Sequence, residues 1–579
     1  MSVRSKLRIP TQVKDFLNKI SYGMDFQLSI NREYLDFFQK LTYAQIETIR
    51  KYSLVDDSKN VPEKSEKQAS GLKQESKNTN VDLATTPKTL SVQQHIQPVS
   101  TESPAVSSVM KDSYYNIPQV LAFLLPKLST KTKEQAVPVI VPKWKTNIKN
   151  TVTKQSIVSR TRHILNSIAT AESKASKWRR IEDLLIHLEQ FPEARHYAVK
   201  DGAIRILLKT RSYTKDENIK GTIREALATL GYIDPLPARG IRILSIDGGG
   251  IRGVLVIEML KKLEKLTGKK VYEMFDYICG VSTGAILSAA LGGHKRKSLD
   301  EISELYKELS TRIFTQSTLR GTSNLVWSHA YYDTSLWEQM LQENLGNRDL
   351  IKTARDPISP KFSVLSAVVN HERVMVYVFR NYAMPIGTES QYVGSSKHKV
   401  WEAVRASAAA PSYFEEFKCG DYLHQDGGIM VNNPCAVAIH EAKQLWPDSP
   451  IQCVVSFGTG RTPFNTISDD DKKEASTSSW KDKFYKILDS ATDTEAVHTT
   501  LNDLLPDHVY YRFNPYLTEM LSMVEIRPEK ISQLEQDAAM YIRRNEEKFQ
   551  KAAKVLMQTK TPTQKVGDWV KLQKNIFGF

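Results

Sequence analysis

Residues 277–287, YICGVSTGAIL, combine a short apolar run, a serine between two glycines and a helix-forming run. A strand that turns sharply into a helix lifts a serine at the turn into a strained position, and Gly280 and Gly284 leave room around it. The first N–H groups of the helix point toward the same turn. The pattern predicts a nucleophile elbow at Ser282, although an ordinary strand-to-helix turn would give the same short motif.

The sequence around the elbow alternates between strand and helix patterns. A strand is predicted at 241–246, then a glycine-rich loop and a helix at 254–266. Later apolar, β-branched runs at 362–369, 374–379 and 451–457 alternate with helical patterns at 299–309, 334–345, 400–408 and 436–445. This alternation predicts an α/β domain with a largely parallel sheet.

Length, charge and cysteine content limit the classes of protein to consider. A chain of 579 residues predicts two or three regions, and a net charge of +15 favours an acidic partner such as nucleic acid or an anionic lipid surface. The four cysteines show no C-x-x-C spacing, so neither a zinc site nor a disulfide framework is predicted. No apolar run is long enough to cross a bilayer, so any membrane contact is expected from outside.

The N-terminal part of the chain differs in composition from the rest. Residues 1–54 form a basic segment that resembles a weak targeting presequence, although Pro10 interrupts it and an ordinary basic segment fits as well. Residues 55–155 are predicted to be a disordered basic linker, because 55–112 are polar and carry almost no aromatic residues. Within this linker, 117–126 form a short apolar segment, too short to span a membrane.

The first folded region after the linker is predicted to be helical and to span 156–236. Three helical patterns follow one another there, the last ending at Gly231, and the segment resembles an armadillo-type repeat. Too few repeats are present to bury both faces, so the region is expected to pack on the next domain. That domain is predicted at 237–465, and 466–579 as a loop and a helical tail that packs on it.

Residues 247–253, DGGGIRG, allow two interpretations. They match a dinucleotide fingerprint, but that site needs an acid at the end of the second strand, and the candidates Glu273 and Asp276 precede it. The alternative is an oxyanion hole, in which the N–H groups of Gly248, Gly249 and Gly250 bind a tetrahedral acyl intermediate. Arg252 then either adds positive charge or pins the loop.

A serine nucleophile requires a base, and Asp426 is the strongest candidate. It is followed by Gly427 and Gly428, which leave an open site, and a carboxylate screened from water could take the serine proton. A Ser-His-Asp triad with His440 or His498 remains an alternative. His440 lies in a helical pattern that favours a structural role, and His424 is expected to matter indirectly.

The motifs DGGGIRG, GVSTG and DGG, in this order, resemble the three signatures of the patatin-like phospholipases. The resemblance covers about 241–460, and the stretches WSHAYYD at 327–333 and ASAAAP at 406–411 are similar to the calcium-independent phospholipases A2 of that family. It implies a patatin-like three-layer domain, a Ser282–Asp426 dyad, an oxyanion hole and neither metal nor other cofactor. The implied supporting residues are Asp247, Arg252, Gly253, Gly280, Gly284, Gly427 and Gly428.

The resemblance also implies the activity and its setting. Members hydrolyse acyl esters of membrane glycerophospholipids to free fatty acid and lysophospholipid, on mitochondrial, peroxisomal or endoplasmic reticulum membranes, of which we favour the mitochondrion. The expected partner is an anionic bilayer surface, and a homo-oligomer stays open. Nucleic acid is not expected, because aromatic residues are not interleaved with the basic clusters.

Two further points stay open at the level of sequence. Trp401 and residues 411–417 form either an apolar rim facing the membrane or buried core. A catalytically silent lipid-binding or scaffolding module, or a Ser-His-Asp esterase of another type, remains the alternative function. Intact Ser282 and Asp426 argue against the silent module.

Overall fold

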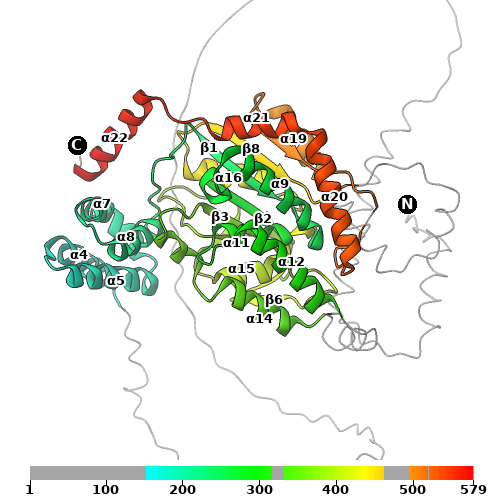
Figure 1. The fold of residues 1–579 in the computed structure, drawn as a ribbon. Helices are drawn as coiled ribbons and strands as arrows, with labels where there is room; N and C mark the ends of the chain where they lie inside the picture. The colour runs from blue at the N-terminus through cyan, green and yellow to red at the C-terminus, as the bar shows by residue number, and fades with distance from the viewer. Residues whose placement is uncertain (1–151, 316–331, 462–493, 520, 578–579) are drawn as a thin grey trace, which may run out of the picture. The chain divides into compact units, whose positions relative to one another are not determined.

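The computed structural model describes residues 152–315, 332–461, 494–519 and 521–577 (Figure 1). All of them lie in the second of two compact units, Gln135–Phe579. The predictions for the basic segment at 1–54, for the linker up to 151, for most of WSHAYYD and for the loop that begins at 462 fall outside the described residues.

A nine-stranded sheet forms the centre of the main domain; seven strands follow the order β5-β4-β3-β2-β1-β8-β9, and β7 pairs with β3 and with β6 off this path. Strands β3, β2, β1, β8 and β9 are parallel neighbours, whereas β4 and β7 both run antiparallel to β3. The prediction of a largely parallel sheet is thus confirmed. The strands are β1 (Ile241–Ile246), β2 (Tyr277–Val281), β3 (Lys361–Val368), β4 (Met375–Arg380), β5 (Val393–Ser395), β6 (Phe417–Cys419), β7 (Tyr422–Asp426), β8 (Ile451–Phe457) and β9 (Tyr510–Phe513).

Helices cover both faces of this sheet, as the side chains of β1 illustrate. Leu244 and Ile246 belong to one apolar cluster, Ile241 and Ile243 to another, because successive strand residues point to opposite faces. The first cluster is completed by α9 (Gly253–Thr267), α11 (Thr283–Gly292), α12 (Leu299–Phe314), α14 (Thr334–Leu345), α15 (Val400–Ser407), α20 (Pro528–Arg544) and α21 (Glu546–Leu556). The second is covered by α16 (Cys435–Leu445), with α19 (Thr494–Leu504) beside it, which gives three layers.

Short elements complete the domain. The helix α10 (Val271–Met274) precedes β2, and three 3₁₀ turns lie at η2 (Gly250–Arg252), η3 (Leu350–Arg355) and η4 (Gly427–Ile429). Two of these turns, η2 and η4, fall within the glycine-rich motifs singled out by the sequence. None of the described helices is both long and apolar enough to cross a bilayer.

The helical region before the sheet has an apolar core of its own. Its helices are α4 (Lys154–Thr170), α5 (Lys174–Gln190), α6 (Ala194–Lys200), α7 (Ala203–Tyr213) and α8 (Glu217–Thr229). Arg355 of η3 pairs with Glu225 of α8 and, at 3.0 Å, with Glu182 of α5, so charged groups join the region to the catalytic domain. The last helix, α22 (Pro562–Phe577), packs on α7. The armadillo-like character of the region stays a prediction.

Candidate active site

The elbow forms where the sequence predicted a sharp turn. β2 ends at Val281, α11 begins at Thr283, and Ser282 between them has φ 53° and ψ −116°, a conformation that residues with a side chain rarely adopt. A Cβ at Gly280 would lie 2.0 Å from the carbonyl oxygen of Gly284, and one at Gly284 would lie 2.2 Å from that of Ile246. Both glycines are therefore needed for strand and helix to approach so closely.

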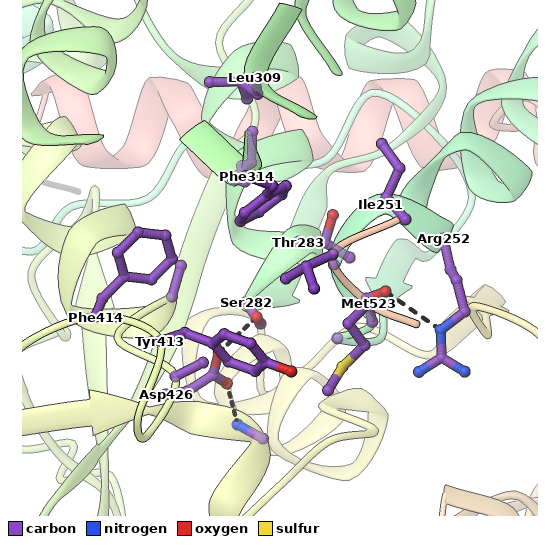
Figure 2. Close-up of a pocket in the computed structure, with 18 of the residues that line it drawn as sticks. Ile251, Arg252, Ser282, Thr283, Leu309, Phe314, Tyr413, Phe414, Asp426 and Met523 are labelled. Atoms are coloured by element: carbon purple, nitrogen blue, oxygen red, sulfur yellow. Dashed lines mark hydrogen bonds between the residues drawn. The ribbon is translucent and has the colours of Figure 1, made fainter. Parts of the chain in front are cut away.

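Asp426 lies at the end of β7 and points at Ser282 (Figure 2). The Ser282 hydroxyl donates to Asp426 Oδ2 at 2.6 Å, and the backbone N–H of Gly428 donates to Oδ1 at 2.8 Å. The second hydrogen bond fixes the plane of the carboxylate. The structure thus brings together Ser282 and Asp426, the residues predicted as nucleophile and base, although they lie 144 positions apart in the sequence.

The environment of Asp426 changes its acidity. Burial raises the pKa of this carboxyl from 3.8 to about 6, and the hydrogen bonds from Ser282 and Gly428 oppose the rise. A carboxylate with this pKa is mostly ionised at neutral pH and is a stronger base than an exposed aspartate. It is therefore suited to take a proton from the serine.

The elbow is anchored by a residue that sequence reasoning missed. The backbone N–H of Ser282 donates to the hydroxyl of Ser407 at 2.9 Å, and that hydroxyl donates to the carbonyl of Leu365 at 2.5 Å. Ser407 lies in the ASAAAP stretch, which was noted only for its resemblance. Because the Ser282 N–H is used in this way, it is not available as an oxyanion donor.

The three predicted oxyanion glycines differ in their hydrogen bonding. The N–H of Gly248 donates to the carbonyl of Asn432 at 3.3 Å, whereas those of Gly249 and Gly250 have no partner within the part of the chain that the structure describes. Arg252 donates from Nε to the carbonyl of Gly249 at 3.3 Å, so it pins the loop. Of the three predicted glycines, Gly249 and Gly250 therefore have N–H groups free to donate, and their role as oxyanion donors stays a prediction.

A buried ion pair holds Asp247, the first residue of the DGGGIRG motif, in place. Arg512 on β9 donates to both carboxylate oxygens of Asp247, at 3.0 and 2.6 Å, and to the hydroxyl of Ser456 at 2.9 Å. Burial alone would lower the pKa of Arg512, but Asp247 raises it above its ordinary range, so the guanidinium stays charged. No sequence signal distinguished Arg512 from the other arginines, since its partner lies far away in the chain.

The supporting glycines lie between closely packed elements. A Cβ at Gly253 would come within 2.6 Å of Thr283 Oγ1, and one at Gly427 within 2.3 Å of the Leu365 carbonyl oxygen. The glycine loop, the elbow and the DGG turn are therefore in direct contact.

A mainly apolar cavity of about 160 Å³ opens beside the dyad (Figure 2). Its wall includes the glycine loop and the apolar side chains Ile251, Ile286, Leu309, Ile313, Phe314, Trp337, Tyr413, Phe414, Ile429, Met523 and Val524. Tyr413 and Phe414 are buried and line this cavity, and Trp401 is buried elsewhere, so these three aromatics do not form an exposed rim.

The histidines considered as alternative bases have other partners. His440 Nε2 accepts from the Gln391 N–H at 3.2 Å, and His498 Nδ1 lies 3.2 Å from the Tyr510 hydroxyl. His424 is fully buried, with Nδ1 2.9 Å from the Ser366 hydroxyl, and burial lowers its pKa to about 4. Among the described residues, no histidine lines the cavity, so no Ser-His-Asp triad forms there.

Known proteins are similar to this chain in sequence. Residues 244–439 match the family described as "Patatin-like phospholipase". The chain is 45% identical over 427 residues to mouse "Calcium-independent phospholipase A2-gamma", covering 74% of this chain and 54% of that protein. It is 32% identical to "Phospholipase A I" of Arabidopsis thaliana, covering 56% and 29%. The chain therefore spans about half the length of the calcium-independent relatives that it matches.

Among solved structures, "Human GIVD cytosolic phospholipase A2" matches with a TM-score of 0.30 and 11% identity, covering 69% of this chain and 64% of that one. The sequence match, together with the three motifs in their order, identifies the family. Through residues 244–439, this chain belongs to the patatin-like phospholipases.

Proposed function

We propose that this protein is a calcium-independent phospholipase that hydrolyses acyl esters of membrane glycerophospholipids to free fatty acid and lysophospholipid. One observation carries the proposal: the Ser282 hydroxyl lies 2.6 Å from a buried carboxylate, at the wall of an apolar cavity. A serine with an adjacent base is the minimal machinery for acyl transfer.

In the first half of the cycle, Ser282 Oγ attacks the ester carbonyl while Asp426 Oδ2 takes the hydroxyl proton. The negative charge that develops on the carbonyl oxygen is stabilised by the N–H groups of Gly249 and Gly250, which have no competing partner among the described residues. When the intermediate collapses, the lysophospholipid leaves with the proton held by Asp426, and the acyl group stays on Ser282.

In the second half, water replaces the lysophospholipid. Asp426 accepts a proton from this water as its oxygen attacks the acyl carbonyl, and the same glycine N–H groups hold the oxyanion. Collapse of the second intermediate releases the fatty acid and returns the proton to Ser282 Oγ. A single carboxylate thus serves twice as base and twice as acid.

The apolar lining of the cavity favours a lipid ester over a polar ester as the substrate. Side chains such as Leu309, Ile313 and Phe314 offer an apolar surface to an acyl chain beside the serine. Burying each methylene of that chain contributes about 0.8 kcal/mol. The polar headgroup would remain at the opening of the cavity.

The substrate implies a membrane partner. The net charge of +15 favours an anionic bilayer surface, and we infer a peripheral association with mitochondrial membranes, with the endoplasmic reticulum and the peroxisome as alternatives. Binding to anionic liposomes should then weaken as salt is added, because the attraction is screened. Salt-independent binding would contradict this part of the proposal.

Covalent labelling and product analysis test the proposal together. A fluorophosphonate should label the wild-type protein and leave Ser282→Ala unlabelled, and both Ser282→Ala and Asp426→Asn should lose hydrolysis of a phospholipid with two different acyl chains. The released fatty acid also identifies which ester is cut. Near wild-type hydrolysis by either variant would refute the dyad, whereas an unlabelled, inactive wild-type protein that binds liposomes would favour the silent lipid-binding module.

A further inference from the structure

A group of potential metal ligands lies apart from the catalytic cavity, where three elements meet. His398 precedes α15, Glu402 belongs to its first turn, and Cys419 ends β6. One ligand atom from each lies within 4.8 Å of the other two, and this is the only group of three such side chains among the described residues. Ligands of one tetrahedral zinc ion lie 2.0–2.3 Å from the ion and so about 3.3–3.8 Å from one another, a separation that small side-chain rotations would reach here.

The hydrogen bonds around His398 prepare one nitrogen for a metal. Its Nε2 lies 3.1 Å from the hydroxyl of Tyr377, while Nδ1 faces the sulfur of Cys419 at 3.0 Å. If Nε2–H donates to Tyr377, the lone pair of Nδ1 points at the cysteine. Histidines that bind metals commonly donate their second ring N–H to an oxygen in this manner.

The backbone holds these ligands in place. The carbonyl of His398 accepts from the N–H of Leu350 at 2.8 Å, and Glu402 Oε2 accepts from the N–H of Lys399 at 2.9 Å as the cap of α15. This leaves Oε1 of Glu402 available, with the Lys399 ammonium 3.9 Å away as the nearest competing cation. All three ligand residues are half-buried, so an ion can reach them from solvent.

We propose that His398, Glu402 and Cys419 bind one Zn²⁺ ion, with water as the fourth ligand. A thiolate, an imidazole and a carboxylate together favour zinc over calcium or magnesium, which prefer oxygen ligands alone. The two anionic ligands balance the charge of the ion. The sequence did not suggest this site, because its ligands follow no C-x-x-C spacing and come from different elements.

Binding requires a change of protonation at the cysteine. The free thiol of a cysteine is largely protonated at neutral pH, whereas the zinc ligand is the thiolate. The zinc–sulfur bond forms as the S–H bond breaks, and about one proton passes to the buffer for each ion bound.

The site would join elements that also carry catalytic groups. Ser407, which anchors Ser282, lies on α15, and β6 pairs antiparallel with β7, which carries Asp426. A zinc ion that links β6 to the start of α15 would thus stabilise this side of the domain against unfolding. The proposed catalytic steps use none of the three ligands. The zinc site rests on the proposed function only through its place in the same domain, and either proposal can be refuted without the other.

The experiment uses the full, reduced, metal-free chain with Zn²⁺ or Co²⁺ as the probe. We expect one equivalent of Zn²⁺, release of about one proton measured in buffers of different ionisation enthalpy, a raised thermal midpoint, and a thiolate-to-metal absorption band with Co²⁺. Cys419→Ser should remove the band. Glu402→Gln should lower the affinity while Gln still caps the helix, and Tyr377→Phe should lower it about tenfold.

Asp421→Asn is the matched control, because it removes an exposed carboxylate from the β6–β7 turn, close to Cys419. It should leave Zn²⁺ affinity unchanged. Binding that survives both Cys419→Ser and Glu402→Gln, a Co²⁺ complex without the thiolate band, or the absence of stoichiometric binding would each overturn the proposal. The metal-free wild-type protein should hydrolyse phospholipid as fast as the zinc-loaded protein, which separates this test from that of the dyad.

Discussion

Replacing Asp426 by asparagine should remove activity and stabilise the fold, and the stabilisation should depend on pH. Burial raises the pKa of this carboxyl from 3.8 to about 6, so the folded protein binds the proton more tightly than the unfolded chain. Below about pH 4 the group is protonated in both states and carries no penalty. As the pH rises through about 6, the folded state must hold a buried charge, and stability is lost.

The size of this effect follows from the shift. A difference of about two pKa units, at 1.36 kcal/mol each, corresponds to about 3 kcal/mol of destabilisation at neutral pH. Asparagine does not titrate and can still accept the N–H of Gly428. The free energy of unfolding of Asp426→Asn, relative to wild type, should therefore increase by up to about 3 kcal/mol between about pH 4 and about pH 7.

The assay is denaturant unfolding of both proteins over that pH range, alongside phospholipid hydrolysis. Asp421→Asn, which removes an exposed carboxylate from the same hairpin, is the control for the loss of one negative charge. If the difference in free energy of unfolding between Asp426→Asn and wild type stays constant with pH, or equals that of the control, then the charge on Asp426 does not destabilise the folded protein. That result would refute the reasoning.

Four other outcomes follow from the same geometry. Hydrolysis should rise with pH through about 6, because only the ionised Asp426 can take the serine proton; a flat profile of kcat/KM between about pH 5 and about pH 7 would contradict this. Ser282→Gly should be more stable than Ser282→Ala by about 1 kcal/mol in thermal unfolding, since glycine adopts φ 53° without strain. Ser407→Ala should lower kcat about fivefold with little change in KM, because the elbow loses one hydrogen bond of about 1 kcal/mol; an unchanged kcat would show that the anchor is unnecessary. Full hydrolysis in excess chelator is expected, because the proposed steps use a carboxylate and backbone N–H groups alone, and loss of activity would contradict it.

The sequence predicted the elements that carry long apolar runs. The runs at 241–246 and 451–457 became β1 and β8 with the same bounds, because parallel strands buried on both faces are apolar throughout. The helix at 334–345 also kept its bounds, since Asp333 caps its first turn. Strands such as β5 and β6, with three residues each, are too short to leave a pattern.

The candidate site was predictable where glycines in the sequence indicated that backbone segments pack closely together. Ser282 and Asp426 each lie beside glycines that the packing requires, which made them stand out. Ser407 and Arg512 gave no such signal, because their roles depend on partners distant in the sequence. The same holds for His398 and Cys419, which only the packing of β6 beside α15 brings together.

The ion pair between Arg512 and Asp247 ties the beginning of the domain to its end. A fragment limited to 244–439 would contain both Ser282 and Asp426 yet lack β8 and β9, and so would leave Asp247 without its counter-ion. On the ribosome, the glycine loop would likewise lack its support until Arg512 has been synthesised and β9 has joined the sheet. A nascent chain that has not yet reached Arg512 would therefore contain both residues of the dyad without the ion pair that positions the glycine loop.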